Sequence, residues 1–376
     1  MAKYKEAEEL FRKVLSKDEA SLGPDHLDVA RDLNNLAQLL QATNRFSEVE
    51  PLMRRGLEIE EKSKGKNHPH LAIQLNNLAG FLRATNRPSE AEPMYRRALA
   101  IDEKSFGKDH PDVATDLNNL ALLLAATNRL SEAEPLMRRA LKIDEDSFGP
   151  DHPNVARDLN NLAQLLADTN RLSEAEPLMR RALKIDEDSF GKDHPKVGTD
   201  LNNLAQLFAA TNRLVEAEPM MRSALKIDED SFGKDHPKVA IRLNNLAGLL
   251  ADTNRLSEAE LLYHRVVEIF EKSLGENHPN VATALNNLAL LLKDTNRLSE
   301  AEPLMRRVVQ IFEKSLGINH PSVATALNNL AALLQATNRL SEAAPMMRRA
   351  LKIFEDSLGP DHPSTKTVRD NLQNLK

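Results

Sequence analysis

One stretch of 42 residues, 153–194, contains the pattern that decides the fold: PNVARDLNNLAQLLADTNRLSEAEPLMRRALKIDEDSFGKDH. In its first part, apolar residues recur at the three- and four-residue steps that are typical of one face of a helix. These residues are Leu159, Leu162, Ala163 and Leu166. Pro153 suits the first turn of such a helix, where its missing N–H is not needed. The pattern therefore predicts a helix over 153–168, which we call helix A.

A second helix is predicted after a short break. Asn170, in the run Thr-Asn-Arg, suits the left-handed backbone conformation that often ends a helix. Ser173, with Glu176 three residues later, resembles a capping box, so we expect the second helix, helix B, to start at Ser173. It runs to about residue 189 and stops at Gly191, a typical C-terminal glycine. Each unit is therefore predicted to be a hairpin of two antiparallel helices.

The hairpin repeats along the chain with a period of 42 residues and no insertion. The first asparagine of an Asn-Asn dipeptide marks each copy: Asn34, Asn76, Asn118, Asn160, Asn202, Asn244, Asn286 and Asn328. A histidine keeps the same step: His26, His68, His110, His152, His194, His236, His278, His320 and His362. A ninth, altered copy of the dipeptide is Asp370-Asn371. One hairpin cannot bury its own apolar face, whereas stacked copies can, so the sequence predicts an all-α solenoid.

We expect a single right-handed superhelical array over residues 1–376, because no linker or shift of composition interrupts the repeat. The expected parts are an initial helix B (1–24), eight copies of the helix pair (25–360) and a C-terminal capping helix (361–376). The last helix, from Pro363 to about Leu375, has Arg369 at the position of Leu327, which is typical of a polar cap.

The first helix B has no helix A before it. Its apolar residues are therefore expected to be exposed: Leu10, Phe11, Val14 and Leu15. We expect either that residues 1–376 are cut from a longer protein or that this end associates with a partner.

The composition of the 376-residue chain excludes several classes of protein. The chain has no cysteine, so it forms no disulfide and has no cysteine-ligated metal. Lysine and arginine total 50 against 56 aspartates and glutamates, and a net charge of −6 does not favour binding to nucleic-acid phosphates. No apolar run approaches the ~20 residues of a membrane-spanning helix, and the N-terminus has no signal-peptide core. We therefore expect a cytoplasmic protein that binds neither nucleic acid nor membrane.

The unit resembles a tetratricopeptide repeat. The residues that support this resemblance are Leu159-Asn-Asn-Leu162-Ala163, Leu166, Asn170, Leu172, Ala175 and Ala182. The usual unit has about 34 residues. The longer helix B and the Gly-x-Asp-His-Pro loop are similar to the 42-residue repeat of the kinesin light chain type. The resemblance implies a binding scaffold with many unrelated partners, in which helix A lines a concave peptide groove.

The face of helix A opposite its apolar stripe is expected to line this groove, at about 100° per residue. It contains the second asparagine of each copy: Asn35, Asn77, Asn119, Asn161, Asn203, Asn245, Asn287 and Asn329. A carboxamide offers a donor and an acceptor, so a ladder of them suits the backbone of an extended peptide. The further candidate binding residues, one turn before or three residues after the second asparagine, are Arg31, Arg157, Gln38, Gln164 and Gln206.

The asparagines have two interpretations. For the first asparagine of each pair, which flanks the core, we favour a structural role. For the second, ligand contact and a role in fixing the angle between repeats stay open alternatives. Family members that clamp a C-terminal carboxylate use lysine or arginine one turn earlier, and here only Arg31 and Arg157 match. A dense basic clamp is absent, which disfavours chaperone tails and strongly acidic peptides as ligands.

No catalytic site, cofactor or metal is predicted. Equivalent histidines of successive hairpins lie about 8–10 Å or more apart, whereas zinc–nitrogen bonds are about 2 Å long. We therefore interpret the histidines as loop and helix-cap residues. Arginine pairs on helix B, such as Arg138-Arg139, lie near acidic residues and predict a salt-bridged outer face. The chain has no phosphate loop, nucleophile elbow or dinucleotide fingerprint.

The sequence thus predicts a non-enzymatic scaffold that binds an extended peptide or a partner protein in the groove. One alternative is a structural array that self-associates through its first helix. Another is the regulatory or sensor part of a larger signalling protein. An RNA-reading helical repeat is disfavoured by the net charge and by the lack of aromatic residues in the groove.

Overall fold

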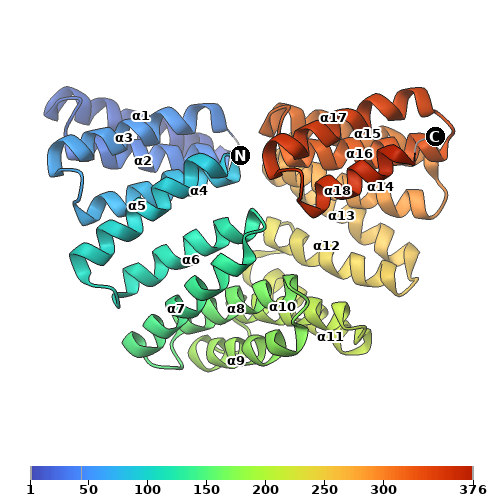
Figure 1. Ribbon diagram of the computed structural model, residues 1–376, viewed down its shortest axis with the longest axis horizontal. Helices are drawn as coiled ribbons and strands as arrows, with labels where there is room; N and C mark the ends of the chain where they lie inside the picture. The colour runs from blue at the N-terminus through green and yellow to red at the C-terminus, as the bar shows by residue number, and fades with distance from the viewer. Residues whose placement is uncertain (1, 44, 375–376) are drawn as a thin grey trace. The chain divides into compact units, whose positions relative to one another are not determined.

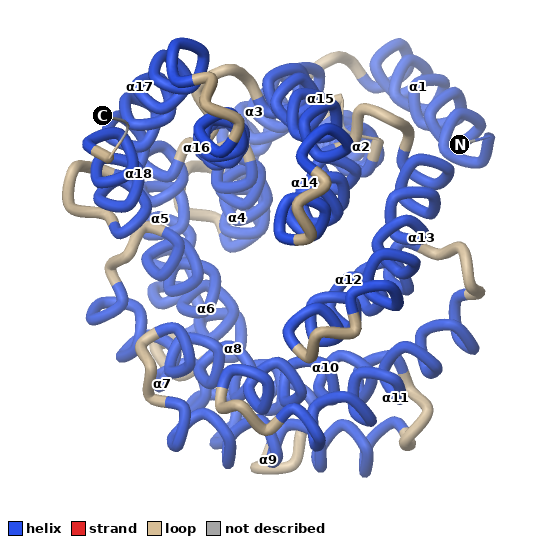
Figure 2. The backbone as a smooth tube through the Cα atoms, turned by 90° about the vertical axis from the view of Figure 1, so that its right-hand side faces the viewer, coloured by secondary structure: helices blue, strands red, loops and turns tan. Residues whose placement is uncertain are grey.

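The computed structural model describes residues 2–43 and 45–374, which form helices joined by short loops (Figure 1). No strand occurs among these residues, and 84% of them are helical (Figure 2). The predicted all-α class, a solenoid of antiparallel helix pairs, is confirmed.

Two kinds of helix alternate and match the predicted helices A and B. The A helices are α2 (Leu27–Ala42), α4 (Pro69–Ala84), α6 (Pro111–Ala126), α8 (Pro153–Asp168), α10 (Pro195–Ala210), α12 (Pro237–Asp252), α14 (Pro279–Asp294), α16 (Pro321–Ala336) and α18 (Pro363–Gln373). The B helices are α1 (Ala2–Leu22), α3 (Phe46–Lys64), α5 (Pro88–Phe106), α7 (Leu130–Phe148), α9 (Leu172–Phe190), α11 (Leu214–Phe232), α13 (Leu256–Leu274), α15 (Leu298–Leu316) and α17 (Leu340–Leu358). In the quoted stretch, helix A has the predicted bounds.

The chain forms two compact units, Met1–Ile185 and Asp186–Lys376, and the boundary between them falls within α9. In the first unit each helix packs against the next, as α4 does on α5 and α5 on α6 (Figure 1). The second unit repeats this arrangement, with α12 on α13 and α13 on α14. Successive pairs therefore bury their apolar faces against each other within each unit.

The core of each copy comes from the predicted apolar stripe. Leu159, Leu162, Ala163 and Leu166 of α8 are all buried. In the preceding copy, Val113, Ala114 and Leu117 of α6 pack against Ala140 and Ile143 of α7. Each buried leucine or isoleucine side chain contributes roughly 1.5–3 kcal/mol, so repetition of the cluster in copy after copy stabilises the array.

The turns between helices have the predicted backbone conformations. Asn170 has a φ of 59° and Gly191 a φ of 86°, both in the left-handed region. The histidines act as helix caps, as expected: His152 Nδ1 accepts a hydrogen bond from the backbone N–H of Asn154 at 3.2 Å. The side chain of each repeat histidine thus satisfies one free N–H at the start of an A helix.

The predicted capping box at the start of helix B is wrong. Helix α9 begins at Leu172, one residue before Ser173. In the equivalent α7, the N-cap residue is Arg129, with a ψ of 55° and no side-chain cap. Its guanidinium instead donates to Glu132 Oε1 at 2.7 Å and to Glu92 Oε2 of α5 at 2.7 Å. The turn thus places an arginine at the cap position, where it joins two successive B helices.

The two ends of the described chain differ. On α1, Leu10 is 58% exposed and Val14 is also exposed, whereas Phe11 and Leu15 are half-buried. On α18, Arg369 donates to Glu355 Oε1 of α17 at 2.8 Å, as a polar cap would. The predicted end of that helix, Leu375, lies outside the described residues.

Among the described helices, none combines the length and the apolar character needed to cross a membrane.

Candidate functional site

The A helices form the more tightly spaced layer within each unit. In the first unit α4 contacts α6 and α6 contacts α8 directly, and in the second α10 contacts α12. Successive B helices are instead joined by long side chains, such as Arg139 Nη1 to Glu103 Oε1 at 2.8 Å. When the helices of one layer lie closer to each other than those of the other layer, the stack curves toward the closely spaced layer. The A helices therefore lie on the concave side of each unit.

The first asparagine of each pair has the structural position that we favoured. Asn34, Asn118 and Asn202 are buried. The amide of Asn118 donates to Asp158 Oδ1 at 2.5 Å, and the amide of Asn76 donates to Asp116 Oδ1 at 2.5 Å. These bonds join one A helix to the next A helix.

Several second asparagines also bond across the A helices. In each case Nδ2 donates to the Oδ1 of the first asparagine of the preceding copy: Asn119 to Asn76 at 3.3 Å, Asn245 to Asn202 at 3.0 Å, Asn287 to Asn244 at 2.8 Å and Asn329 to Asn286 at 2.9 Å. We call this set the asparagine ladder. Within the described part of the chain, the other four make no side-chain hydrogen bond: Asn35, Asn77, Asn161 and Asn203. The second asparagines therefore divide into a bonded and an unbonded group.

The other candidate residues also lie on the A helices. Gln38, Gln164 and Gln206 are exposed, and Gln164 donates to Asp168 Oδ1 at 2.9 Å. The two candidate arginines are bound to carboxylates of their own chain. Arg31 Nη1 donates to Asp28 Oδ1 at 2.8 Å, and Arg157 donates to both Asp144 and Asp158. Both guanidinium groups are therefore already paired and are not free to bind a ligand carboxylate.

Sequence reasoning missed a set of buried acid pairs between helix B and the following helix A. The buried pairs are Asp102 with Asp116, Asp144 with Asp158, and Asp186 with Asp200, and at the same register Asp18, which is half-buried, precedes the buried Asp32. Burial raises the pKa of Asp102 to about 6, of Asp116 to about 7 and of Asp158 to about 6. The sequence signal was an acidic residue two positions before Asn-Asn, with a second one 14 residues earlier.

Two cavities lie at equivalent positions of the repeat, four periods apart. The acidic pocket, of about 300 Å³, is lined by His68, Pro69, His70, Ile73, Asn76, Asp102, Phe106, Asp112, Thr115 and Asp116. The apolar pocket, of about 140 Å³, is lined by Ile241, Asn244, Phe270, Asn280, Thr283 and Ala284. Each contains the first asparagine of a pair, so each adjoins the asparagine positions of its own unit.

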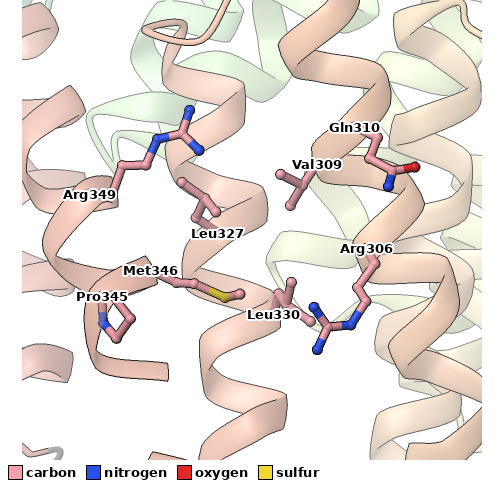
Figure 3. A pocket seen from close by; sticks show the side chains of 8 residues that line it. All are labelled: Arg306, Val309, Gln310, Leu327, Leu330, Pro345, Met346 and Arg349. Carbon is pink, nitrogen blue, oxygen red and sulfur yellow. The ribbon is translucent and has the colours of Figure 1, made fainter. Parts of the chain in front are cut away.

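A third cavity, of about 430 Å³, lies between α15 and α17 over α16 (Figure 3). Figure 3 shows Leu327 and Leu330 of α16 between the side chains of Arg306 and Arg349. Both arginines are paired, Arg306 with Glu302 at 2.8 Å and Arg349 with Glu313 at 2.5 Å. We call this the B-helix pocket; it is an apolar gap rather than a charged site.

Among the described residues, no group of three or more histidine, aspartate or glutamate side chains is arranged to bind a metal ion. The site thus consists of amides and paired arginines on the inner helix layer, and of buried carboxyls between this layer and the B helices. Such groups are suited to hydrogen bonding and ion pairing with a ligand.

The chain was compared with known proteins. A family model described as "Tetratricopeptide repeat" matches residues 1–62, 70–146, 131–188, 171–230, 213–272, 239–314, 297–356 and 322–372. A search of curated proteins finds no significant relative.

Solved structures share the fold. BtubC (BKLC) from P. vanneervenii is 23% identical with a TM-score of 0.50, over 63% of this chain and 94% of that one. A Rap protein complexed with Competence and Sporulation Factor is 14% identical with a TM-score of 0.57, over 93% of this chain and 98% of that one. A putative kinesin light chain from Podosopora anserina, with nearly identical TPR-like repeats, is 25% identical with a TM-score of 0.46, over 55% and 97% of the two chains.

Proposed function

Because the chain belongs to the tetratricopeptide repeat family, we propose that it is a non-enzymatic scaffold that binds an extended peptide or a partner protein along its A helices. The family fold is typically a non-catalytic scaffold for protein interactions. The observation that carries the proposal is the group of half-buried or exposed second asparagines without a side-chain partner: Asn35, Asn77 and Asn161 in the first unit, and Asn203 in the second.

The amides without a side-chain hydrogen bond can offer all of their donors and acceptors to a ligand, whereas the bonded amides cannot. An unbonded carboxamide on the inner layer offers its donor and its acceptor together, which matches the C=O and N–H of a peptide backbone. The bonded amides of the asparagine ladder have used one of their two Nδ2 hydrogens, and this bond fixes the orientation of the amide. The Rap protein, which shares the fold, was solved in complex with Competence and Sporulation Factor, and this supports an interaction role for the present chain.

The proposal is tested by peptide-display selection on the whole chain and on the triple variant Asn35→Ala, Asn77→Ala, Asn161→Ala. We expect selected peptides to bind the wild-type chain and to lose at least tenfold in affinity, about 1.4 kcal/mol, on the variant. Since these amides make no hydrogen bond within the described chain, the variant should keep its thermal midpoint.

A matched control replaces three exposed residues at one register of the B helices: Lys62→Ala, Lys104→Ala and Asp146→Ala. This control should bind the selected peptides as the wild type does. Equal loss in both variants, or peptides that bind the asparagine variant normally, would exclude the A-helix surface as the binding site. No enriched peptide on the wild type would favour a folded partner or self-association.

One observation favours self-association as a second candidate function. Val14 of α1 is exposed, although its equivalents Ala98, Ala140 and Val266 are fully buried in later B helices. A second chain packed on α1 would cover Val14 and Leu10. Light scattering at increasing concentration would then show a rising mass, and the substitution Leu10→Lys would abolish the rise.

A further inference from the structure

The acidic pocket contains two carboxyl groups that are buried without a cation. Asp102 is 5% exposed and Asp116 is 1% exposed. Asp116 Oδ1 accepts from Asn76, and the two carboxyls lie within hydrogen-bond reach of each other. No other donor in the described part of the chain reaches Asp116 Oδ2 or Asp102 Oδ1, and the equivalent oxygens of the Asp144–Asp158 pair lack a donor as well. We call Asp102 and Asp116 the acid pair of this pocket. A buried carboxyl pair of this kind is unfavourable unless a counter-charge or a shared proton compensates it.

Other copies of the repeat show which group compensates such a pair. In α7 and α8, Arg157 donates from Nη2 to Asp144 Oδ2 and from Nε to Asp158 Oδ1, both at 3.0 Å. One guanidinium thus bridges the two carboxylates. In α11 and α12, Arg242 lies at the position of Asp116 and donates from Nε to Asp228 Oδ2 at 2.8 Å. The repeat geometry therefore accommodates a guanidinium at this register.

The acidic pocket lacks such a residue of its own. Thr115 replaces the arginine, and its hydroxyl donates to the backbone carbonyl of Pro111 at 3.4 Å. Asp112 adds a third carboxylate to the lining, and no lysine or arginine lines the pocket. The positive charge that Arg157 supplies one copy later is missing here, and a cavity of about 300 Å³ lies in front of the carboxyls.

The rest of the lining suits a long basic side chain. Ile73 is 56% exposed and Phe106 is 44% exposed, and together with Pro69 they give the pocket an apolar rim. The methylene groups of an arginine can lie against such a rim while the guanidinium reaches the carboxyls. The planar guanidinium matches two carboxylates better than the point charge of a lysine does.

We propose that the acidic pocket binds the guanidinium of an arginine side chain supplied by the ligand. This inference rests on the proposed function, because it specifies one residue of the peptide or partner. Asn76, which lines the pocket, also accepts the ladder bond from Asn119 at 3.3 Å. A peptide bound along the asparagines of the first unit therefore passes the mouth of the pocket and can insert a side chain there.

Binding of the guanidinium should strengthen as pH rises. Burial raises the pKa of both acid-pair carboxyls, so a bound cation displaces a proton from the pair. The other titratable groups around the pair are His68 and His70 at the start of α4, His110 at the start of α6, and Asp112.

The test uses methyl-labelled isoleucines of the whole chain as reporters. Ile73 lines the acidic pocket, and Ile241 lines the apolar pocket at the equivalent position. The probe is the peptide acetyl-Gly-Gly-Arg-Gly-Gly-amide, and the matched control probe has citrulline, which is neutral and of equal shape, in place of arginine. We expect the arginine probe to shift the Ile73 methyl signal at millimolar concentration and to leave Ile241 unchanged, with at least tenfold weaker binding of the citrulline probe.

Two variants complete the test. Asp102→Phe with Asp116→Ala copies the apolar pocket into the first unit, and Asp102→Asn with Asp116→Asn removes charge with little change of shape. Both variants should bind the arginine probe at least tenfold more weakly, as measured by the Ile73 methyl signal. Equal binding of the two probes, an unmoved Ile73 signal, or full binding to the Asn variant would overturn the proposal.

The outcomes separate this inference from the proposed function. Display-selected peptides that depend on Asn77 but show no enrichment of arginine would leave the scaffold role intact and exclude the arginine pocket. A shift of Ile73 by the short arginine probe, with no peptide selected by display, would support the pocket and exclude an extended peptide groove.

Discussion

The acidic pocket and the apolar pocket occupy the same register of the repeat but contain opposite chemistry. In the first unit, Asp102 of α5 faces Asp116 of α6, and the cavity beside them measures about 300 Å³. In the second unit, Phe270 of α13 and Ala284 of α14 occupy those positions, and the cavity measures about 140 Å³. The Phe270 ring, packed against the Ala284 methyl group, therefore fills space that the two carboxyls leave open in the first unit.

The two positions change together along the chain. Acid pairs occur in early copies, as in Asp144 with Asp158, whereas later copies have Phe312 with Ala326. Both versions of the pair are buried on the same helix scaffold. A phenylalanine–alanine pair fills the core, whereas an acid pair lowers stability unless a cation binds between the two carboxyls. The difference teaches that one repeat geometry can be used either for stability or for recognition.

The substitution Phe270→Asp is expected to have the largest effect on this comparison. It removes a buried ring and leaves a lone carboxylate opposite Ala284. We expect the free energy of unfolding to fall by about 3–5 kcal/mol, as for other buried aromatic deletions. Urea unfolding followed by circular dichroism measures this loss.

Leu261→Asp is the matched control, because Leu261 lies on the same helix but is exposed. It should change the free energy of unfolding by less than about 0.5 kcal/mol. A similar small change for Phe270→Asp would mean that Phe270 does not support the packing of α13 on α14.

The acid pair should make stability depend on pH. Its folded pKa values, about 6 for Asp102 and about 7 for Asp116, lie above the ordinary value of 3.8. Carboxyls with raised pKa values contribute stability that is fully present below the unfolded pKa and is lost as pH rises through the folded values. From about pH 5 to about pH 8, the wild-type chain should lose on the order of 4 kcal/mol through this pair.

The variant Asp102→Phe, Asp116→Ala isolates that contribution. The other groups with shifted pKa values are present in both proteins; they include the ion-paired glutamates and Asp32, Asp144, Asp158, Asp186, His278, His320 and His362. The difference in unfolding free energy between variant and wild type should therefore grow in favour of the variant as pH rises. A difference that is constant with pH would show that the pair titrates normally in the folded chain.

Much of the fold was predictable because it depends on local signals. The proline before Asn154, the left-handed Asn170 and the terminal Gly191 act within one turn of their own position, and each is where the sequence placed it. The start of helix B was predicted one residue late, because the left-handed turn at Asn170 places Arg171, rather than Ser173, before the first helical residue.

The candidate site was less predictable because it depends on register between helices. Asp102 and Asp116 are 14 residues apart in sequence and belong to different helices, so neither appears unusual alone. Asn119 and Asn161 both follow Asp-Leu-Asn, yet only Asn119 bonds to a preceding asparagine. This bond joins two copies of the repeat, so the sequence of one copy alone does not predict it.

The smallest expected effect concerns the B-helix pocket. There a later copy and an earlier copy differ in the size of one apolar side chain. Val309 lines this pocket, whereas the equivalent residue of α5 is Leu99, which packs against the core of α6 and α7. Val309→Leu adds one methylene to the gap and should stabilise the chain by about 0.8 kcal/mol. The mirrored change Leu99→Val should destabilise the chain by about 1 kcal/mol, as loss of a buried methylene does.

Thermal and urea midpoints of both variants measure the effects. If Val309→Leu destabilises the chain, the pocket has no room for the added group.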